Sequence, residues 1–388
     1  MIFEKLMSVP DLPKRLRDES RPIFLYGTGN GADKILDAMS RYEIPCEGVF
    51  ASDGFVRDRT FRGMKVRSYS DTVSEYGDDI VILCAFGSPR EEVLSFLGEL
   101  GRRHTLYIPE VPLFCRSLAD ELFTADYAAA HRNEIEEAYS LFDEEYSREI
   151  FFEMLAVRLS GDPAYLSRTQ EVRESVSELV PPGVRRVIDC GAFRGDTASL
   201  FLSELESIDE IMCIEPDPRT FRHLSAFAES DPRCLAVNAA VGCENGKTVF
   251  MSSSSRASAA GGRNRRAKQV ECDVIRIDET EIAKASVGRE LFIKYDVEGG
   301  ERDALIGSRD TIARTMCPLS VALYHRTEDI FALPLLINSM NPGYRFRLRR
   351  PRCVPAWELT LYTLCIPDAH TFFGMCAFLF RLFVLIRL

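Results

Sequence analysis

The sequence has no closely paired cysteines and no apolar segment near its N-terminus. Its 12 cysteines are scattered, without a CxxC pair or a regular spacing, which favours reduced thiols over a disulfide framework and argues against a zinc site. Residues 1–20, MIFEKLMSVPDLPKRLRDES, lack the sustained apolar run of a signal peptide. We therefore expect a cytoplasmic protein.

Positive charge is outweighed by negative charge, with 48 Lys and Arg against 59 Asp and Glu. The formal net charge is −11, so the surface as a whole repels phosphate backbones, and we discount nucleic-acid binding.

No internal repeat of fixed period is present. A chain of 388 residues is too long for one ordinary core, so we expect two domains.

Short β-rich runs alternate with helical patterns in two separate parts of the chain, which is the βαβ rhythm of parallel sheets covered by helices. The expected fold class is α/β, with two Rossmann-like domains joined by a helical segment. The divisions we expect are an N-terminal Rossmann-like domain (1–116), a helical connector (117–183), a second sheet domain (184–366) and an apolar C-terminal tail (367–388).

The connector has the apolar spacing of a helix. From Ile135 to Met154 apolar residues recur every three or four positions, which predicts one long amphipathic helix over about 130–158. Acids such as Asp143 and Glu144 are expected on its solvated face.

A glycine-rich turn opens the second sheet domain. In VIDCGAFRGDT a strand leads through Asp189, Gly191 and Gly195 into a helical pattern. Glycines at such a turn let the backbone pass close to a ligand, and the following helix offers free N–H groups. The next strand ends in Glu215, with Asp217 following in IEPDP. An acid at the end of that strand can accept hydrogen bonds from the ribose hydroxyls of an adenosine, so the pair of features favours nucleoside binding.

The spacing D-x-G-x-x-x-G leaves less room for a pyrophosphate than G-x-G-x-x-G, and it suits a ligand without phosphate, such as S-adenosylmethionine. VIDCGAFRGDT, IEPDP, NAAVG and IKYDVEGGERDALIG together resemble the FkbM-type family of S-adenosylmethionine-dependent methyltransferases, from about Asp143 to about Leu364. Tyr295, Cys190 and Phe193 depart from the residues common in that family. These departures bear on the shape of the substrate rather than on the cofactor.

The strand LFIKYDVEGGE ends in acids and glycines. Side chains at alternate positions share one face of a regular strand, so Lys294, Asp296 and Glu298 are expected to point the same way, with the lysine keeping the acids ionised. We expect Asp296 first, and Glu298 second, to orient or deprotonate an acceptor hydroxyl. His325 ends the next strand and is a candidate base. A structural ion-pair cluster is the alternative, and a divalent metal site at Asp296, Glu298 and His325 is compatible with the sequence but not required by it.

The N-terminal domain has a glycine turn of its own. In LYGTGNGA the residues Gly27, Gly29 and Ala32 match G-x-G-x-x-A, and Asp53 follows the second strand, which is the spacing of a nucleotide-binding fingerprint. The segment FRGMKVRSYSD is similar to the front domain of PglD-type sugar acyltransferases. This turn either binds a nucleotide or belongs to a domain kept for packing, and we expect the domain to be independent of methyl transfer.

The FkbM resemblance implies a class I methyltransferase sheet in 184–366 and S-adenosylmethionine as cofactor. It also implies O-methyl transfer to a hydroxyl of a glycan, nucleotide-sugar or natural-product acceptor, in pathways such as polysaccharide biosynthesis. Two rivals stay open at this point. One is a non-catalytic nucleotide-binding protein, and the other is a nucleotide-sugar oxidoreductase that uses the N-terminal turn.

Two basic stretches and the apolar tail complete the candidate features. Either basic stretch offers a grip for a phosphate or carboxylate of the acceptor; their members are Arg263, Arg265, Arg266 and Lys268, and Arg345, Arg347 and Arg349. Residues 372–388 are almost entirely apolar. They predict a buried element, a homodimer contact or a membrane-surface anchor, which leaves membrane association open.

Overall fold

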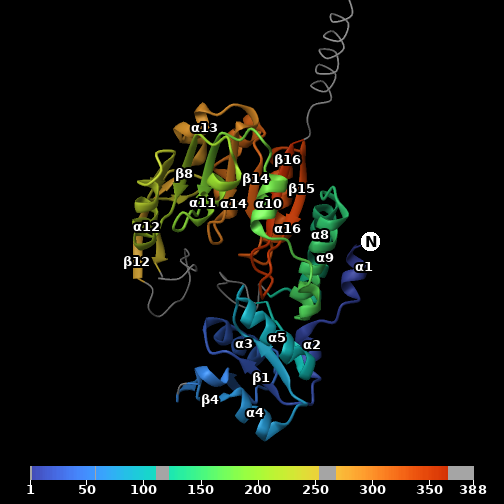
Figure 1. The fold of residues 1–388 in the computed structure, drawn as a ribbon. Helices are drawn as coiled ribbons and strands as arrows, with labels where there is room; N and C mark the ends of the chain where they lie inside the picture. Colours follow the sequence, from blue (N-terminus) through green and yellow to red (C-terminus); the bar gives the residue numbers. More distant parts are fainter. Residues whose placement is uncertain (1, 57, 111–121, 253–267, 366–388) are drawn as a thin grey trace, which may run out of the picture.

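The computed structural model describes residues 2–56, 58–110, 122–252 and 268–365. Figure 1 shows one α/β body at the bottom, formed by the N-terminal part of the chain, and a second at the top, formed by the C-terminal part. Helices α8 and α9 run along one side between the two bodies. This arrangement confirms the expected α/β fold class with two Rossmann-like sheets.

The described residues of the front domain form a six-stranded sheet in the order β3-β4-β2-β1-β5-β6, parallel except for the β3–β4 hairpin. Strands β1, β2 and β5 are buried at every position because helices cover the sheet. The β3–β4 hairpin is short and mostly half-buried, and its only apolar alternation is the four-residue run Met64–Arg67. The elements are β1 Ile23–Tyr26, β2 Gly48–Ala51, β3 Thr60–Phe61, β4 Met64–Ser68, β5 Val81–Cys84, β6 Thr105–Tyr107, α2 Leu12–Arg17, α3 Asn30–Arg41, α4 Tyr69–Tyr76, α5 Glu91–Arg103 and the 3-10 helix η1 Asp53–Phe55.

The connector contains two helices where one long helix was expected. Helix α8 ends at Ser140 and α9 begins at Glu145, and the buried side chain of Phe142 lies in the break between them. Helix α1 packs on this unit as well, through an ion pair of 2.8 Å between Glu4 and Arg132. The elements are α1 Ile2–Met7, α7 Ala125–Ala130, α8 Arg132–Ser140, α9 Glu145–Ser160, η2 Pro163–Leu166 and α10 Val172–Leu179.

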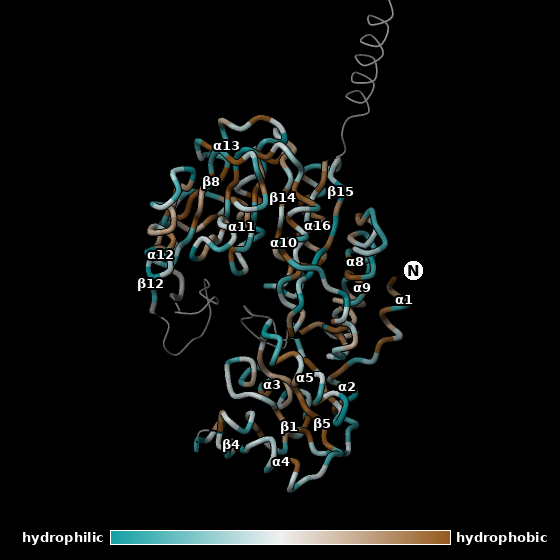
Figure 2. The backbone as a smooth tube through the Cα atoms, viewed as in Figure 1, coloured by the Kyte–Doolittle hydropathy of each residue, from teal (hydrophilic) through white to brown (hydrophobic). Residues whose placement is uncertain are grey.

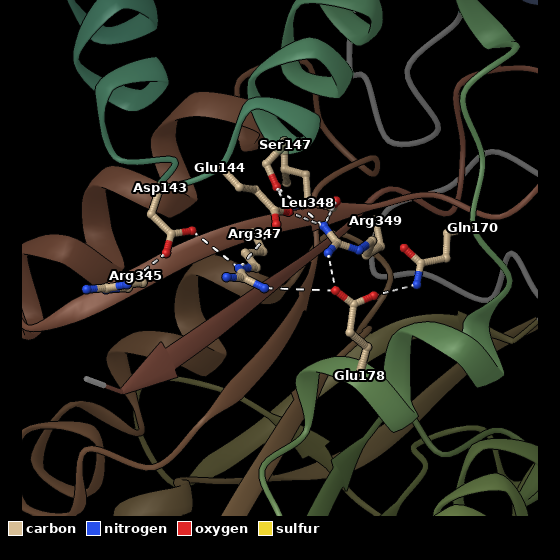
Figure 3. A network of polar contacts seen from close by, with 9 residues as sticks. All are labelled: Asp143, Glu144, Ser147, Gln170, Glu178, Arg345, Arg347, Leu348 and Arg349. Carbon is tan, nitrogen blue, oxygen red and sulfur yellow. Dashed lines mark hydrogen bonds and ion pairs between the residues drawn. The ribbon is translucent and has the colours of Figure 1, made fainter. Parts of the chain in front are cut away.

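The acids at the α8–α9 break bind the arginines of β15 (Figure 3). Asp143 lies 3.3 Å from Arg347 and 3.5 Å from Arg345, and Glu144 pairs with Arg349. The predicted solvated face is therefore wrong at these two positions. Arg347 and Arg349 of β15 are thus engaged in ion pairs within the fold, whereas the side chain of Arg345 is 52% exposed.

The second domain has a seven-stranded sheet among its described residues, in the order β15-β16-β14-β13-β7-β8-β9. Its strands are parallel except for β16, which is antiparallel to both neighbours. After β7 the chain builds β8 and β9 on one side and then crosses to β13 on the other. The boundary between β7 and β13 is thus the switch point at which open α/β sheets bind ligands.

A small sheet, β10-β12-β11, stands beside the large one. The strands of the second domain are β7 Arg186–Cys190, β8 Glu210–Ile214, β9 Cys234–Val237, β10 Ala240–Val241, β11 Gly246–Ser252, β12 Lys268–Ile275, β13 Leu291–Tyr295, β14 Leu319–Ala322, β15 Tyr344–Arg349 and β16 Thr360–Cys365. Its helices are α11 Asp196–Glu204, α12 Pro218–Ala228, α13 Glu281–Ala285, α14 Glu301–Ile306, α15 Arg309–Thr315 and α16 Asp329–Met340, with η3 Ile277–Glu279 and η4 Gly288–Glu290.

The front domain shares its core with the rest of the protein. Phe24 and Ile82 of the front sheet belong to the same buried apolar cluster as Phe142 and Ile293. Figure 2 shows apolar backbone positions along the strands inside both bodies and hydrophilic ones along many outer turns. Ser88 also exchanges two backbone hydrogen bonds, of 2.8 and 3.2 Å, with Val354 of the second domain. The two domains are therefore in contact through their cores and through this backbone pair, and the independence of the front domain from methyl transfer stays a prediction.

Several expectations concern residues outside this description. Arg263, Arg265 and Arg266 lie there, as does the tail 367–388, whereas Lys268 opens strand β12. None of the helices in the described part of the chain combines the length and the apolar character of a membrane span. The cysteines of the described residues are free thiols, as expected.

Candidate active site

A cavity of about 930 Å³ opens at the carboxyl ends of β7, β8 and β13. It lies at the switch point of the large sheet, and its volume is in the range of small-molecule sites. Glu215 and Asp296 line it from the second domain, and Gly87, Ser88 and Pro89 line it from the front domain. Both domains therefore contribute to one site.

The glycine turn after β7 is required by close backbone approach. Gly191 has a φ of +84°, and a Cβ placed there would lie 1.9 Å from the carbonyl oxygen of Asp296. Gly195 has a φ of +92°, and its Cβ would lie 2.4 Å from the ring of Phe227. Only glycine combines this backbone conformation with such contacts. The turn thus holds the ends of β7 and β13 together beneath the cavity.

The substitution Gly191→Ala is expected to separate these strand ends. Because the added methyl group collides with backbone rather than with a flexible side chain, we expect the melting temperature to fall and binding to the cavity to be lost. Thermal unfolding and calorimetry would measure both effects. Gly183→Ala is a matched control, because Gly183 also has a positive φ of +95° but nothing within 4 Å of its Cβ position. Equal effects of the two substitutions would contradict the role given to Gly191.

Glu215 lies at the end of β8 and is held by the backbone around it. Its two carboxylate oxygens accept hydrogen bonds from Asp217 N–H (2.9 Å) and Phe193 N–H (3.1 Å). Asn238 donates to the carbonyl oxygen of Glu215 at 2.8 Å and fixes the turn. Burial raises the pKa of Glu215 to about 7 in spite of these hydrogen bonds. A ligand that donates to the carboxylate would stabilise its ionised form.

Three of the predicted cofactor residues, Asp189, Gly195 and Asp217, are not among the residues that line the cavity. Asp189 is fully buried and accepts a hydrogen bond of 3.0 Å from Lys294 Nζ, which itself lines the cavity. Asp217 is also fully buried and caps helix α12 by accepting from Arg219 N–H at 2.8 Å. Asp189 thus positions Lys294, and Asp217 starts the helix after Glu215, while contact of either residue with a cofactor stays a prediction.

The acids after β13 converge on a histidine. The strand ends at Tyr295, and Glu298 has a left-handed backbone with a φ of 56°, so the expectation of one regular strand face is wrong. Nevertheless, His325 Nε2 lies 3.6 Å from Asp296 Oδ1 and 3.5 Å from Glu298 Oε2. Lys294 Nζ lies 3.7 Å from Asp296 Oδ2. The four predicted catalytic residues are therefore neighbours.

His325 is placed as a charged partner of these acids. It is fully buried, and its Nδ1 lies 2.9 Å from Glu301 Oε1. Burial alone would lower the pKa of His325, but the carboxylates of Glu301, Asp296 and Glu298 outweigh it and raise the pKa to about 10. With this pKa the imidazole is protonated at neutral pH and pairs with the acids around it, and the role of His325 as a base stays a prediction.

Asp296 is the better placed of the two candidate acids. Burial raises the pKa of Glu298 to about 8, against the opposing charge of His325, so Glu298 is a poor base at neutral pH. Asp296 accepts a hydrogen bond from Tyr324 Oη at 3.2 Å. The Asp189 and Asp296 carboxylates overcome the effect of burial on the nearby Lys294 and raise its pKa, so the ammonium stays charged beside Asp296.

The N-terminal turn has packing and capping roles. A Cβ on Gly27 would lie 2.8 Å from the ring of Phe86, Gly29 caps helix α3, and Ala32 is fully buried. Asp53 accepts a backbone hydrogen bond of 3.0 Å from Ser70 and a second one from its hydroxyl. None of these four residues lines the cavity, and nucleotide binding at this turn stays a prediction.

Sequence reasoning missed several residues that line the cavity. Tyr324 and Arg326 flank His325, and Trp357 and Glu358 precede β16. Trp357 packs against Gly87 of the front domain, where a Cβ would lie 2.2 Å from the indole ring. The one sequence feature that could have pointed to these residues is Trp357, the single tryptophan in the sequence, which is followed by an acid.

The order of the large sheet, its antiparallel β16 and the cavity at the β7–β13 switch point are those of the Rossmann-like fold found in class I methyltransferases. Residues 189–346 match the family model described as methyltransferase FkbM domain. The FkbM resemblance is thereby confirmed for this part of the chain, which contains the glycine turn, Glu215 and the acids after β13.

Comparison with solved structures supports the same fold. The chain is similar to a crystal structure of methyltransferase FkbM from Methylobacillus flagellatus KT, with a TM-score of 0.67, 18% identity and coverage of 94% of this chain and 97% of that one. At this identity the likeness shows the fold alone, and it extends over the front domain. The similarity of the front domain to PglD-type enzymes is not confirmed.

Two further solved structures match only about half of the chain. A putative rRNA-methylase from Clostridium thermocellum has a TM-score of 0.33, 7% identity and coverage of 51% of this chain and 94% of that one. The Aeropyrum pernix fibrillarin in complex with S-adenosyl-L-methionine has a TM-score of 0.30, 13% identity and coverage of 51% and 76%. TM-scores this low carry no argument here. The search of curated proteins found no match.

Proposed function

We propose that this protein is an S-adenosylmethionine-dependent O-methyltransferase that acts on a hydroxyl of a glycan, nucleotide-sugar or natural-product acceptor. The observation that carries the proposal is the single cavity that contains both Glu215 and Asp296. Glu215 suits a ribose, and Asp296 suits a hydroxyl that loses its proton. One cavity thus joins a nucleoside site to an acid beside an acceptor site.

The residues of the glycine turn fit the proposed cofactor. Gly191, Phe193 and Asp196 line the cavity next to Glu215. This side of the cavity therefore offers the Glu215 carboxylate to the ribose and the Asp196 carboxylate to an amino group of the cofactor. The one arginine of this turn, Arg194, is exposed and is not among the residues that line the cavity, and Lys294 on the neighbouring strand β13 is bound to Asp189. When bound, S-adenosylmethionine supplies an electrophilic methyl group.

The chain's own residues would hold and activate the acceptor. Tyr324 and Lys294 keep Asp296 oriented and ionised, so Asp296 can accept the proton of a hydroxyl placed in line with the methyl group. Trp357, Glu358 and Arg326 line the same cavity. An aromatic face beside charged hydrogen-bonding groups is suited to a polar, ring-shaped acceptor such as a sugar.

Calorimetric titration tests the proposal. S-adenosylmethionine should bind to the full chain, NAD should not, and Glu215→Ala should weaken the binding by about 1–3 kcal/mol, the usual loss for hydrogen bonds to a charged group. Binding of NAD alone would favour the oxidoreductase. Binding of S-adenosylmethionine without methyl transfer to any acceptor would favour a non-catalytic nucleotide-binding protein.

The affinity for the cofactor should also depend on pH. Because the pKa of Glu215 is raised to about 7, the carboxylate takes up a proton as the pH falls through that value and can no longer accept both ribose hydroxyls. If binding requires the ionised form, affinity should be about tenfold weaker at pH 6 than at pH 8. The matched control is Glu215→Gln, which should bind weakly at both pH values. A wild-type affinity that does not change with pH would contradict the role of Glu215.

A further inference from the structure

His325 is oriented in the way that a metal-binding histidine usually is. Its Nδ1 lies 2.9 Å from Glu301 Oε1, and the same oxygen accepts a hydrogen bond of 2.8 Å from Val297 N–H. A carboxylate beside one ring nitrogen fixes the ring and directs the other nitrogen at a metal ion. The other nitrogen, Nε2, faces Asp296 and Glu298 across the end of the cavity.

The distances at Nε2 are longer than hydrogen bonds and close to those between ligands of one ion. Asp296 Oδ1 and Glu298 Oε2 lie 3.6 and 3.5 Å from Nε2, whereas a hydrogen bond would measure about 2.7–3.2 Å. With metal–ligand distances of about 2.0–2.2 Å, neighbouring ligand atoms of one ion lie roughly 3.0–3.5 Å apart. Small side-chain movements would therefore let these atoms bind a common ion.

Negative charge exceeds positive charge around this point. One ligand atom each of Asp296, Glu301 and His325 lie within 4.8 Å of one another. Glu301 is fully buried, and its Oε2 has no hydrogen-bond partner. Lys294 is shared with Asp189, and the nearby Arg326 donates to the carbonyl oxygen of Gly299 at 2.9 Å. A buried, incompletely satisfied carboxylate beside two further acids is stabilised by positive charge, which either the protonated imidazole of His325 or a bound cation can supply.

We propose that Asp296, Glu298 and His325 Nε2 bind a divalent cation, which displaces the protons that Nε2 and the Glu298 carboxyl carry without it, and that Glu301 positions the histidine. Asp296 and Glu298 line the cavity, which provides the route of entry, and the remaining coordination positions face the acceptor side. Mixed carboxylate and imidazole ligands suit ions such as Mn²⁺. The consequence for methyl transfer rests on the proposed function, because the ion would lie beside the acceptor hydroxyl; the binding itself does not.

The test uses the full chain, freed of metal by a chelator, with Mn²⁺ alone as the probe and no cofactor or acceptor. Electron paramagnetic resonance of free Mn²⁺ should reveal one saturable site per chain. Glu298→Gln and His325→Gln should each weaken it at least tenfold, and Glu301→Gln should weaken it by about 10–100-fold, as the loss of an orienting partner does. Circular dichroism would verify that each variant is folded, and Glu298→Gln is the safer variant because its side chain is partly exposed.

Glu328→Gln is the matched control. Glu328 lies in the same loop as His325 but outside the cluster, and its replacement removes the same charge. Its Mn²⁺ affinity should equal that of the wild type. Absence of a saturable site, or equal weakening by Glu328→Gln and Glu298→Gln, would overturn the proposal. Neither result would affect the titration with S-adenosylmethionine, so failure of the metal site and failure of the proposed methyltransferase are distinguishable.

Discussion

Replacement of Asp296 by asparagine is expected to lower the turnover of a methyl acceptor by about 10²–10⁴-fold, the range typical of general-base assistance. Asparagine keeps the shape of the side chain but cannot take up the proton of the acceptor hydroxyl. The loss should therefore appear mainly in kcat, and the affinity for S-adenosylmethionine should survive, because the ribose acid Glu215 is untouched. Steady-state kinetics with a verified acceptor and calorimetry would measure the two quantities.

Glu358→Gln is an informative comparison for this prediction. Glu358 lines the same cavity but belongs to the segment before β16 rather than to the acids after β13. We expect it to bind the acceptor rather than to take up its proton, so Glu358→Gln should raise KM for the acceptor more than it lowers kcat. A chelator adds a second comparison: it should reduce wild-type turnover if the cation proposed above takes part. Normal turnover by Asp296→Asn would make the acids after β13 structural, and another proton acceptor would have to be sought in the cavity.

The parts of the site that sequence could predict are those set by local geometry. Gly191 and Glu215 stand at the ends of strands with clear apolar patterns, and parallel strands bring such ends to one edge of a sheet. His325 was predicted beside Asp296 for the same reason, because β14 is the neighbour of β13. Rules that depend on a strand and the turn directly after it were therefore sufficient for these residues.

The parts that sequence could not predict depend on contacts between distant segments. The apolar period from Ile135 to Met154 continues across Phe142, and only the arginines of β15, about 200 positions further on, reveal why the helix breaks there. In the same way, the hydrogen bond between Lys294 and Asp189 joins residues 105 positions apart and has no local sequence signal. The contribution of Gly87 and Trp357 to the cavity requires knowledge of how the two domains pack.

Domain packing also explains how the front domain can influence the active site. Glu110, at the end of the described front domain, lies 2.7 Å from Arg158 on helix α9, and both side chains are nearly inaccessible. Arg158 in turn donates to the carbonyl oxygens of Thr327 and Leu323, at 3.1 and 3.4 Å. These two carbonyl groups flank the segment that carries Tyr324 and His325. A single buried arginine thus connects the front domain to the loop of the active site.

Arg158→Met is expected to reduce the free energy of unfolding by about 3–5 kcal/mol, the usual cost of leaving one partner of a buried ion pair uncompensated. Arg148→Met is the matched control on the same helix: its pair with Glu145 is largely exposed, so the change should be below about 1 kcal/mol. Denaturant unfolding would measure both. Similar losses in the two variants would refute the special role of Arg158.

The pH dependence of this loss identifies Glu110 as its cause. Burial raises the pKa of Glu110 from 4.5 to about 7 even beside Arg158, so the folded state binds more protons than the unfolded state between these values, and stability falls as the pH rises through that window. Removal of the arginine should raise the pKa further and make the loss in Arg158→Met larger at pH 8 than at pH 5. In the double variant Arg158→Met, Glu110→Gln the extra loss at pH 8 should disappear, because no buried carboxylate remains to be ionised. If it persists, the stability of this junction comes from the hydrogen bonds to Thr327 and Leu323 rather than from the ion pair.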